Sequence, residues 1–168
     1  MAKLEDYSSG AVLEGVKEKE RMLEKIDGPE GSEVREELER REKGAEKRHF
    51  IVGLDVLEGL VEKSSVVAVG PRVCLEIHED CRRPERAVFL DELAEALIER
   101  GKAERTTEKE VMEVLREGKR KGHSHVVSIV SGKPMELCNT CSHCCILWKL
   151  EEEGIKCISK ESPSFIQV

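Results

Sequence analysis

The sequence predicts an α+β or α/β fold that is mostly helical, with a small sheet and a cysteine-rich metal-binding loop. Apolar residues recur at helical spacing along much of the chain, whereas residues 66–69 and 125–130 are short β-branched runs typical of buried strands. Four of the seven cysteines lie between Cys138 and Cys145, which indicates one local site rather than an evenly spread disulfide framework. A length of 168 residues allows one domain with an appendage.

Residues 1–50 are expected to form a charged helical appendage, because half of them are lysine, arginine, aspartate or glutamate. A sparse apolar stripe from Val12 to Ile26 predicts one helix, which ends at Gly28-Pro29. The acidic residues after Ser32 predict the start of a second helix, since negative charge is favourable in a first turn. Polar helices often bridge to other elements, so this segment is either a solvated appendage or an arm that docks a partner protein.

Residues 51–168 are expected to form an iron–sulfur cysteine-box domain. Thr107 precedes Glu110 by three residues, the spacing of a capping box, and predicts the start of a helix that stops at Gly122. The other expected elements, in chain order, are a helix over 51–62, a strand over 66–69, a helix over 87–100, a strand over 125–130, a turn over 131–134, a helix over 146–153 and a last strand over 155–158.

Composition excludes several functional classes. The net charge of −7 argues against nucleic acid or an anionic membrane as the main partner, and 3% aromatic residues provide no platform for stacking bases. No apolar run approaches the roughly 20 residues of a membrane span, and the first residues do not resemble a signal peptide, so we expect a cytoplasmic protein. Asn139 and Gln167 are the only side-chain amides, which favours a thermophilic source.

The cysteine spacing predicts an iron–sulfur centre. Cys138, Cys141 and Cys144 follow one another at intervals of three, and thiolates at this spacing can hold a [4Fe-4S] cluster when a fourth arrives from elsewhere in the chain. We expect Cys74 to be this fourth ligand, with Cys81 and Cys145 as alternates. Zinc bound by two cysteine pairs is the alternative cofactor. No cysteine-proline pair follows Cys144 three residues on, unlike in a plain bacterial ferredoxin.

The remaining candidate ligands are weaker. Cys157 lies in an apolar stretch and is expected to be a small buried hydrophobe. His143 lies inside the cysteine cluster, but thiolates outcompete imidazole for such centres. His123 and His125 flank a strand, where packing is a commoner role than metal binding.

Several segments resemble a family of anaerobe and archaeal iron–sulfur proteins that contain a cysteine-dense box and a ferredoxin domain with two four-iron clusters. The similar stretches are 122–127, the turn to Pro134, the cysteine box with Ile146-Leu147, and the earlier segments 69–74 and 81–84, where Arg72 stands in place of a cysteine. The resemblance covers roughly residues 60–168 and implies a cysteine-box domain without the C-terminal two-cluster ferredoxin domain. Residues 162–168 are similar to the linker that leads into that domain.

The expected function is therefore electron transfer through one [4Fe-4S] cluster to a redox partner protein. Two alternatives come from other functional classes. One is a zinc-stabilised adaptor with no redox role. The other is a metal-dependent enzyme of thiol or sulfur chemistry, in which Cys145 or Cys81 is a reactive thiol beside the metal.

Overall fold

The computed structural model describes residues 2–78, 81, 86–161, 163–164 and 166. Within these residues, helices and one six-stranded sheet form an α+β fold, as predicted, and every pair of neighbouring strands is antiparallel. The strand order is β1-β5-β6-β3-β2-β4. The strands are β1 (His49–Val52), β2 (Val67–Pro71), β3 (Arg86–Leu90), β4 (Glu104–Arg105), β5 (Ser124–Val130) and β6 (Lys133–Thr140).

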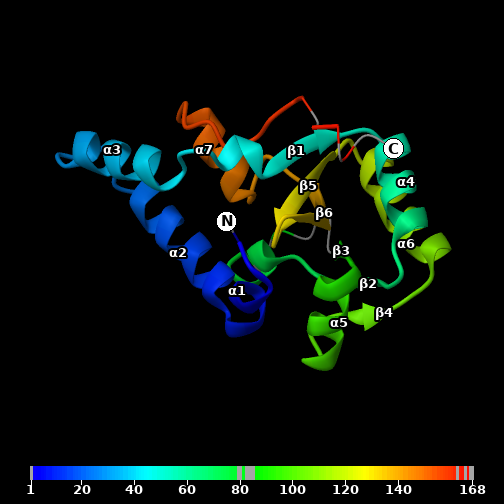
Figure 1. The fold of residues 1–168 in the computed structure, drawn as a ribbon. Coiled ribbons are helices and arrows are strands. Elements are labelled where there is room, and N and C mark those ends of the chain that lie inside the picture. Colours follow the sequence, from blue (N-terminus) through cyan, green and yellow to red (C-terminus); the bar gives the residue numbers. More distant parts are fainter. Residues whose placement is uncertain (1, 79–80, 82–85, 162, 165, 167–168) are drawn as a thin grey trace.

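Two helices cover one face of the sheet: α4 (Leu54–Lys63) and α6 (Glu108–Arg120) (Figure 1). Leu57 and Leu115 from these helices are fully buried against strand residues such as Val127 and Leu137. Successive strand residues point to opposite faces, and Val127 and Ile129 of β5 and Leu137 of β6 belong to this core. Even-numbered residues, Cys138 among them, face the other side.

The opposite face is covered by helices from both ends of the chain (Figure 1). Tyr7 of α1 (Leu4–Ser9) and Leu93 of α5 (Asp91–Glu99) belong to one buried cluster with Phe89 of β3. A second cluster joins Leu38 and Leu150. It is built by α2 (Ala11–Leu23), α3 (Gly31–Arg41) and α7 (Ile146–Glu152), and two short 3-10 turns, η1 (Ala45–Lys47) and η2 (Val73–Glu76), complete the elements.

Several predicted elements are confirmed. Thr107 accepts a hydrogen bond from the Glu110 backbone and begins α6, which ends before Gly122. β5 and the turn after it lie as expected, and α7 is followed by Gly154 in the left-handed conformation. The sequence predicted a helix from Val12 to Ile26, and α2 covers most of it.

Other predicted elements are wrong. The helix expected over 51–62 starts only at Leu54, because the residues before it extend as β1 and pair with β5. Ala87 to Leu90 is strand β3 rather than the start of a helix; this uninterrupted apolar run carries no periodicity that separates the two. β6 was not predicted at all. Residues 155–158 form no strand, and a single parallel bridge joins Phe50 to Ser159, directly after them.

The helices of residues 4–41 contact the rest of the protein. Arg35 forms an ion pair with Glu153 beyond α7, and Ser131 in the turn after β5 donates its backbone N–H to the carbonyl of Ala2. The division of the chain at residue 50 stays a prediction. Among the described residues, no helix combines the length and the apolar character needed to cross a membrane.

Gly118 in α6 leaves space for the side chain of Asn139, which lies in the cysteine-rich segment from Cys138 to Cys145. A Cβ atom on Gly118 would lie 2.4–2.9 Å from the side-chain atoms of Asn139, which is buried and follows Cys138 directly. We expect Gly118→Ala to lower the free energy of unfolding by about 1–3 kcal/mol, the usual cost of overpacking. Gly15→Ala in α2 is the control, because a Cβ there meets no atom within 4 Å, and it should stabilise the helix by about 0.5–1 kcal/mol. Equal effects of both variants in urea unfolding would contradict this account.

Candidate metal centre

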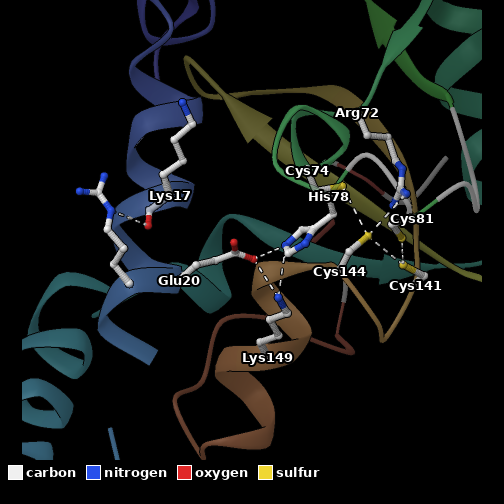
Figure 2. Close-up of polar contacts among 10 residues, drawn as sticks. Lys17, Glu20, Arg72, Cys74, His78, Cys81, Cys141, Cys144 and Lys149 are labelled. Atoms are coloured by element: carbon white, nitrogen blue, oxygen red, sulfur yellow. Dashed lines mark hydrogen bonds and ion pairs between the residues drawn. The ribbon is translucent and has the colours of Figure 1, made fainter. Parts of the chain in front are cut away.

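Four cysteines from two distant segments converge at one end of the sheet (Figure 2). The Sγ atoms of Cys81, Cys141 and Cys144 all lie within 4.8 Å of one another, so these three residues could hold a metal ion. Cys141 Sγ is 3.2 Å from Cys144 Sγ and 3.5 Å from Cys81 Sγ. Cys74 Sγ lies 4.0 Å from Cys144 Sγ. We call Cys74, Cys81, Cys141 and Cys144 the four-thiol centre.

Three of the sulfur–sulfur separations in the centre are close to those around a single metal ion. Each exceeds the S–S bond of a disulfide, which is about 2.05 Å long. A zinc ion that binds thiolates at about 2.3 Å holds them at tetrahedral corners about 3.8 Å apart. The three separations, 3.2, 3.5 and 4.0 Å, lie on both sides of this value. A four-iron cluster holds its cysteine sulfurs farther apart, since each sulfur binds a different iron atom.

Local structure brings the thiols together. Pro71 ends β2, and the chain then turns into η2, which contains Cys74. The backbone N–H of His78 donates to the carbonyl oxygen of Cys74, and that of Cys81 donates to the carbonyl oxygen of His78. In the second segment, β6 ends at Thr140, and the chain then turns so that the side chains of Cys141 and Cys144 point toward each other. Cys145 then begins α7 as its N-cap residue. Of the earlier cysteine segment, Arg82 to Pro84 lies outside the described residues.

Arg72 places a buried cation beside the thiols. Its side chain is 2% exposed; Nη1 donates to the backbone carbonyl of Asn139 at 3.2 Å, and Nη2 donates to Cys144 Sγ at 3.7 Å. Burial lowers the pKa of the guanidinium, but the charges of Cys138, Cys74 and Cys144 outweigh it and hold the pKa above its ordinary value. Arg72 therefore places a positive charge where it can balance thiolates once these cysteines ionise, a role that the sequence did not reveal.

The pKa values of the thiols diverge. Burial raises the pKa of Cys141, but hydrogen bonds from Cys144, Cys81 and Arg72 outweigh it and bring the value down to about 6. Burial raises the pKa of Cys144, and also that of Cys74. The Cys141–Cys144 pair therefore releases its first proton below the ordinary pKa of a cysteine, and the hydrogen bonds to Cys141 favour the negative charge on that sulfur.

This difference predicts a selective alkylation in the metal-free protein. Iodoacetamide should modify Cys141 first, and the rate should rise as the pH passes about 6, because only the thiolate is a nucleophile. Cys145 should stay unmodified at neutral pH, since burial raises its pKa to about 11. Peptide mass spectrometry across a pH series measures both. A midpoint near 8.5, the value of a free cysteine, would contradict the predicted environment.

The other predicted ligands lie at different places. Cys138 is on β6, opposite Ala87 and Val126, and its Sγ lies 3.8 Å from the Asn139 carbonyl oxygen. Cys138 is not one of the three thiols within 4.8 Å of one another, and the role predicted for it is untested. Cys157 is fully buried, as predicted from its apolar neighbours in the sequence. It lies in the cluster around Leu38 and Leu150.

His125 and His49 make contacts outside the four-thiol centre. His125 Nε2 lies 2.9 Å from the carbonyl oxygen of Leu115 in α6, so this ring connects β5 to the helix that covers it. His143 is exposed to solvent. His49 Nδ1 lies 2.9 Å from Ser128 Oγ.

An ion cluster holds His78, which follows η2 and precedes Cys81 in the sequence (Figure 2). Glu20 of α2 accepts a hydrogen bond from Lys149 Nζ of α7 at 2.8 Å, and His78 Nε2 of the loop lies 2.6 Å from the same oxygen. Burial raises the pKa of the Glu20 carboxyl, but the hydrogen bonds from Lys149 and His78 outweigh it and lower the value. Helices α2 and α7 therefore hold the loop that carries two thiols of the centre.

Removing the charge of Glu20 should loosen this loop. We expect Glu20→Gln to weaken metal binding by about 10–100-fold, the usual effect of losing a group that orients a ligand. Glu14→Gln is the control, because Glu14 lies on the exposed side of α2 and pairs only with Lys17 in the described contacts. Competition with a chromophoric chelator measures the affinities. Equal affinities of both variants would show that the ion cluster does not support the centre.

Comparison of the chain with protein-family models, curated proteins and solved structures found no match. The resemblance to anaerobe and archaeal iron–sulfur proteins stays a prediction. Function is therefore inferred from the chemistry of the centre, and three converging thiols establish a possible metal site without fixing the metal.

Proposed function

We propose that this protein is a metal–thiolate protein in which Cys74, Cys81, Cys141 and Cys144 bind one tetrahedral ion, with zinc as the ion. One observation carries the proposal: the Sγ atoms of Cys81, Cys141 and Cys144 lie within 4.8 Å of one another around a common point. Four thiolates around zinc form a closed structural site. The bound ion would fasten the loop after β2 to the turn after β6 and so stabilise a scaffold.

The electrostatics support a divalent ion in this place. Four thiolates around a divalent cation carry a net charge of −2, and burying such a charge is costly without a compensating cation. Arg72 supplies one from within 3.7 Å of Cys144 Sγ. Soft thiolate ligands also select zinc and iron over magnesium or calcium.

A [4Fe-4S] cluster with an electron-transfer role is the second candidate. The observation that favours it is the spacing of Cys138, Cys141 and Cys144, which follow one another at intervals of three. In this case Cys74 or Cys81 completes the ligand set, and a partner protein exchanges electrons with the cluster. The polar surface of α2 and α3 is the docking surface we would assign to that partner.

Anaerobic purification followed by metal analysis and an absorption spectrum separates the two candidates. The zinc proposal expects a colourless protein with one equivalent of zinc. A broad absorption band that bleaches on reduction, together with about four irons per chain, would replace it with the iron–sulfur candidate. A protein that retains neither metal after anaerobic purification, and that binds neither on addition, would overturn the proposal as a whole.

Two matched variants test the ligand set. Under the zinc proposal, Cys81→Ser should lose the metal, while Cys138→Ser should keep one equivalent, because the described contact of Cys138 Sγ is with the Asn139 carbonyl oxygen, whereas that of Cys74 Sγ is with Cys144 Sγ. The iron–sulfur candidate with Cys138 as a ligand expects the loss of iron in Cys138→Ser. Metal content per folded chain, measured after gel filtration, distinguishes the two patterns.

A further inference from the structure

A cavity of about 460 Å³ lies beside the four-thiol centre, on the sheet face that is covered by α1 and α2. Its floor is formed by residues of one parity on β5 and β6, among them Ser128, Glu136 and Cys138. Its roof is α2, and α7 closes one end through Ile146. The cavity therefore separates the two buried clusters on this face of the sheet, and its volume falls within the range of small-molecule sites, about 300–1,000 Å³.

Small residues keep the roof of the cavity open. Ala11 and Gly15 lie one turn apart on α2, and both line the cavity. A Cβ atom on Gly15 would meet no atom within 4 Å, so packing does not require glycine at this position. A glycine inside a helix costs about 0.5–1 kcal/mol relative to alanine, and its presence here preserves volume at the expense of helix stability. Val12, Val16 and Leu147 make this side of the cavity apolar.

Hydrogen-bonding groups from the strands and from α1 also line the cavity. The Tyr7 hydroxyl donates to the Glu136 carboxyl group, and His49 Nδ1 contacts Ser128 Oγ at 2.9 Å. Burial, with the nearby charges of Arg48 and Lys19, lowers the pKa of His49 to about 3, so this ring is neutral at physiological pH. Sites for small organic molecules combine such a set of polar groups with mostly apolar walls.

Three charged side chains that line the cavity have partners within the protein. Lys19 lies 2.7 Å from the buried carboxylate of Glu42. Arg72 is engaged by Cys144 and by the Asn139 carbonyl group. A charged ligand would have to give up its hydration without gaining a dedicated counter-ion from these residues, which is unfavourable.

We propose that this cavity binds an uncharged small organic molecule, with an apolar body against Gly15 and its neighbours on α2 and a hydrogen-bonding group directed at Tyr7, Glu136 and Ser128. Cys74 and Arg72 line the same cavity and belong to, or contact, the four-thiol centre. The bound molecule would therefore lie next to the metal site. This inference goes beyond the proposed metal site and does not depend on which metal is bound.

Trp148 offers a direct readout, because it is the single tryptophan of the chain and its Nε1 donates to Thr140, a residue that lines the cavity. Benzyl alcohol is the probe, titrated into the purified metal-loaded protein and followed by tryptophan fluorescence and by NMR. Benzoate and benzylammonium are its charged counterparts of equal size. We expect saturable binding of benzyl alcohol that is about tenfold or more tighter than that of either ion.

Gly15→Leu should fill the cavity and weaken benzyl alcohol binding by about tenfold or more, whereas Glu14→Leu, on the exposed side of α2, should leave it unchanged. Ala11→Leu narrows the same cavity and replaces Gly15→Leu should that variant fail to fold. Metal content is measured in parallel, so lost probe binding with retained metal separates this proposal from the metal site. Absent binding to the wild-type protein, equal binding to Gly15→Leu and Ala11→Leu, or equal binding of the charged probes would overturn it.

Discussion

Cys141→Ser is expected to abolish metal binding and to cause one of the two largest losses of stability among single substitutions. Cys141 is the middle thiol of the four-thiol centre, at 3.2 Å from Cys144 Sγ and 3.5 Å from Cys81 Sγ. Serine removes a soft ligand. Loss of a group that only orients a ligand weakens metal affinity by about 10–100-fold, and we expect a larger loss of metal affinity here. Because the metal binds only the folded chain, its loss should also lower the melting temperature.

Cys157→Ser is the matched control for this experiment. Cys157 is fully buried but lies in the cluster of Leu38 and Leu150, and its pKa is raised by burial to about 12. The buried hydroxyl should cost about 1–3 kcal/mol of stability, while the metal content stays at that of the wild type. Metal analysis and thermal unfolding of both variants decide the question. Full metal occupancy in Cys141→Ser, or its loss in Cys157→Ser, would reverse the assignment of the ligands.

Arg72→Leu should have the second large effect. Arg72 is 2% exposed and interacts with Cys144 Sγ and with the carbonyl oxygen of Asn139. Leucine removes the cation that balances the thiolates, and breaking a buried charge pair from one side costs about 3–5 kcal/mol. We expect the free energy of unfolding to fall by this amount and metal affinity to fall with it.

Two further variants make the Arg72 prediction specific. Arg72→Lys retains the charge but not the planar group that reaches two acceptors, so it should restore only part of the metal affinity. Arg116→Leu removes an exposed arginine that pairs with Glu58 at 3.1 Å, and this should change stability by no more than about 1 kcal/mol. Urea unfolding of the three proteins with and without metal measures these effects. A change in Arg72→Leu no larger than that in Arg116→Leu would contradict the role of the buried cation.

The helices and strands that could be predicted from the sequence were those with a helix-capping motif or a clear pattern of apolar residues. Thr107 and Glu110 begin α6 as a capping box, and β5 is a run of β-branched residues between polar ends. β3 could not be predicted, because Ala87 to Leu90 is apolar on both faces and a buried strand then looks like a buried helix. β6 carries Pro134 near its start and polar residues beside Cys138, which weakens the sequence signal for a strand.

The candidate site was predictable only where its residues are neighbours in sequence. The spacing of Cys141 and Cys144 marks them as candidate ligands, and Cys74 and Cys81 could be named because thiols are rare elsewhere in the chain. The geometry of the centre depends on pairing between distant segments, so sequence alone could not show that Cys81 lies 3.5 Å from Cys141. Arg72 and Glu20 carry no motif, and their roles come entirely from the fold that places them there.

The sequence separation within the four-thiol centre has a consequence for synthesis on the ribosome. Cys81 and Cys141 are 60 residues apart, and Cys74 and Cys144 are 70 apart. A nascent chain that has not yet extended past Cys144 offers Cys74 and Cys81 without their partners and cannot retain a tetrahedral ion. If the centre binds the proposed ion, uptake follows translation of the turn after β6, and a link across a loop of this size removes on the order of 4 kcal/mol of chain entropy from the unfolded state.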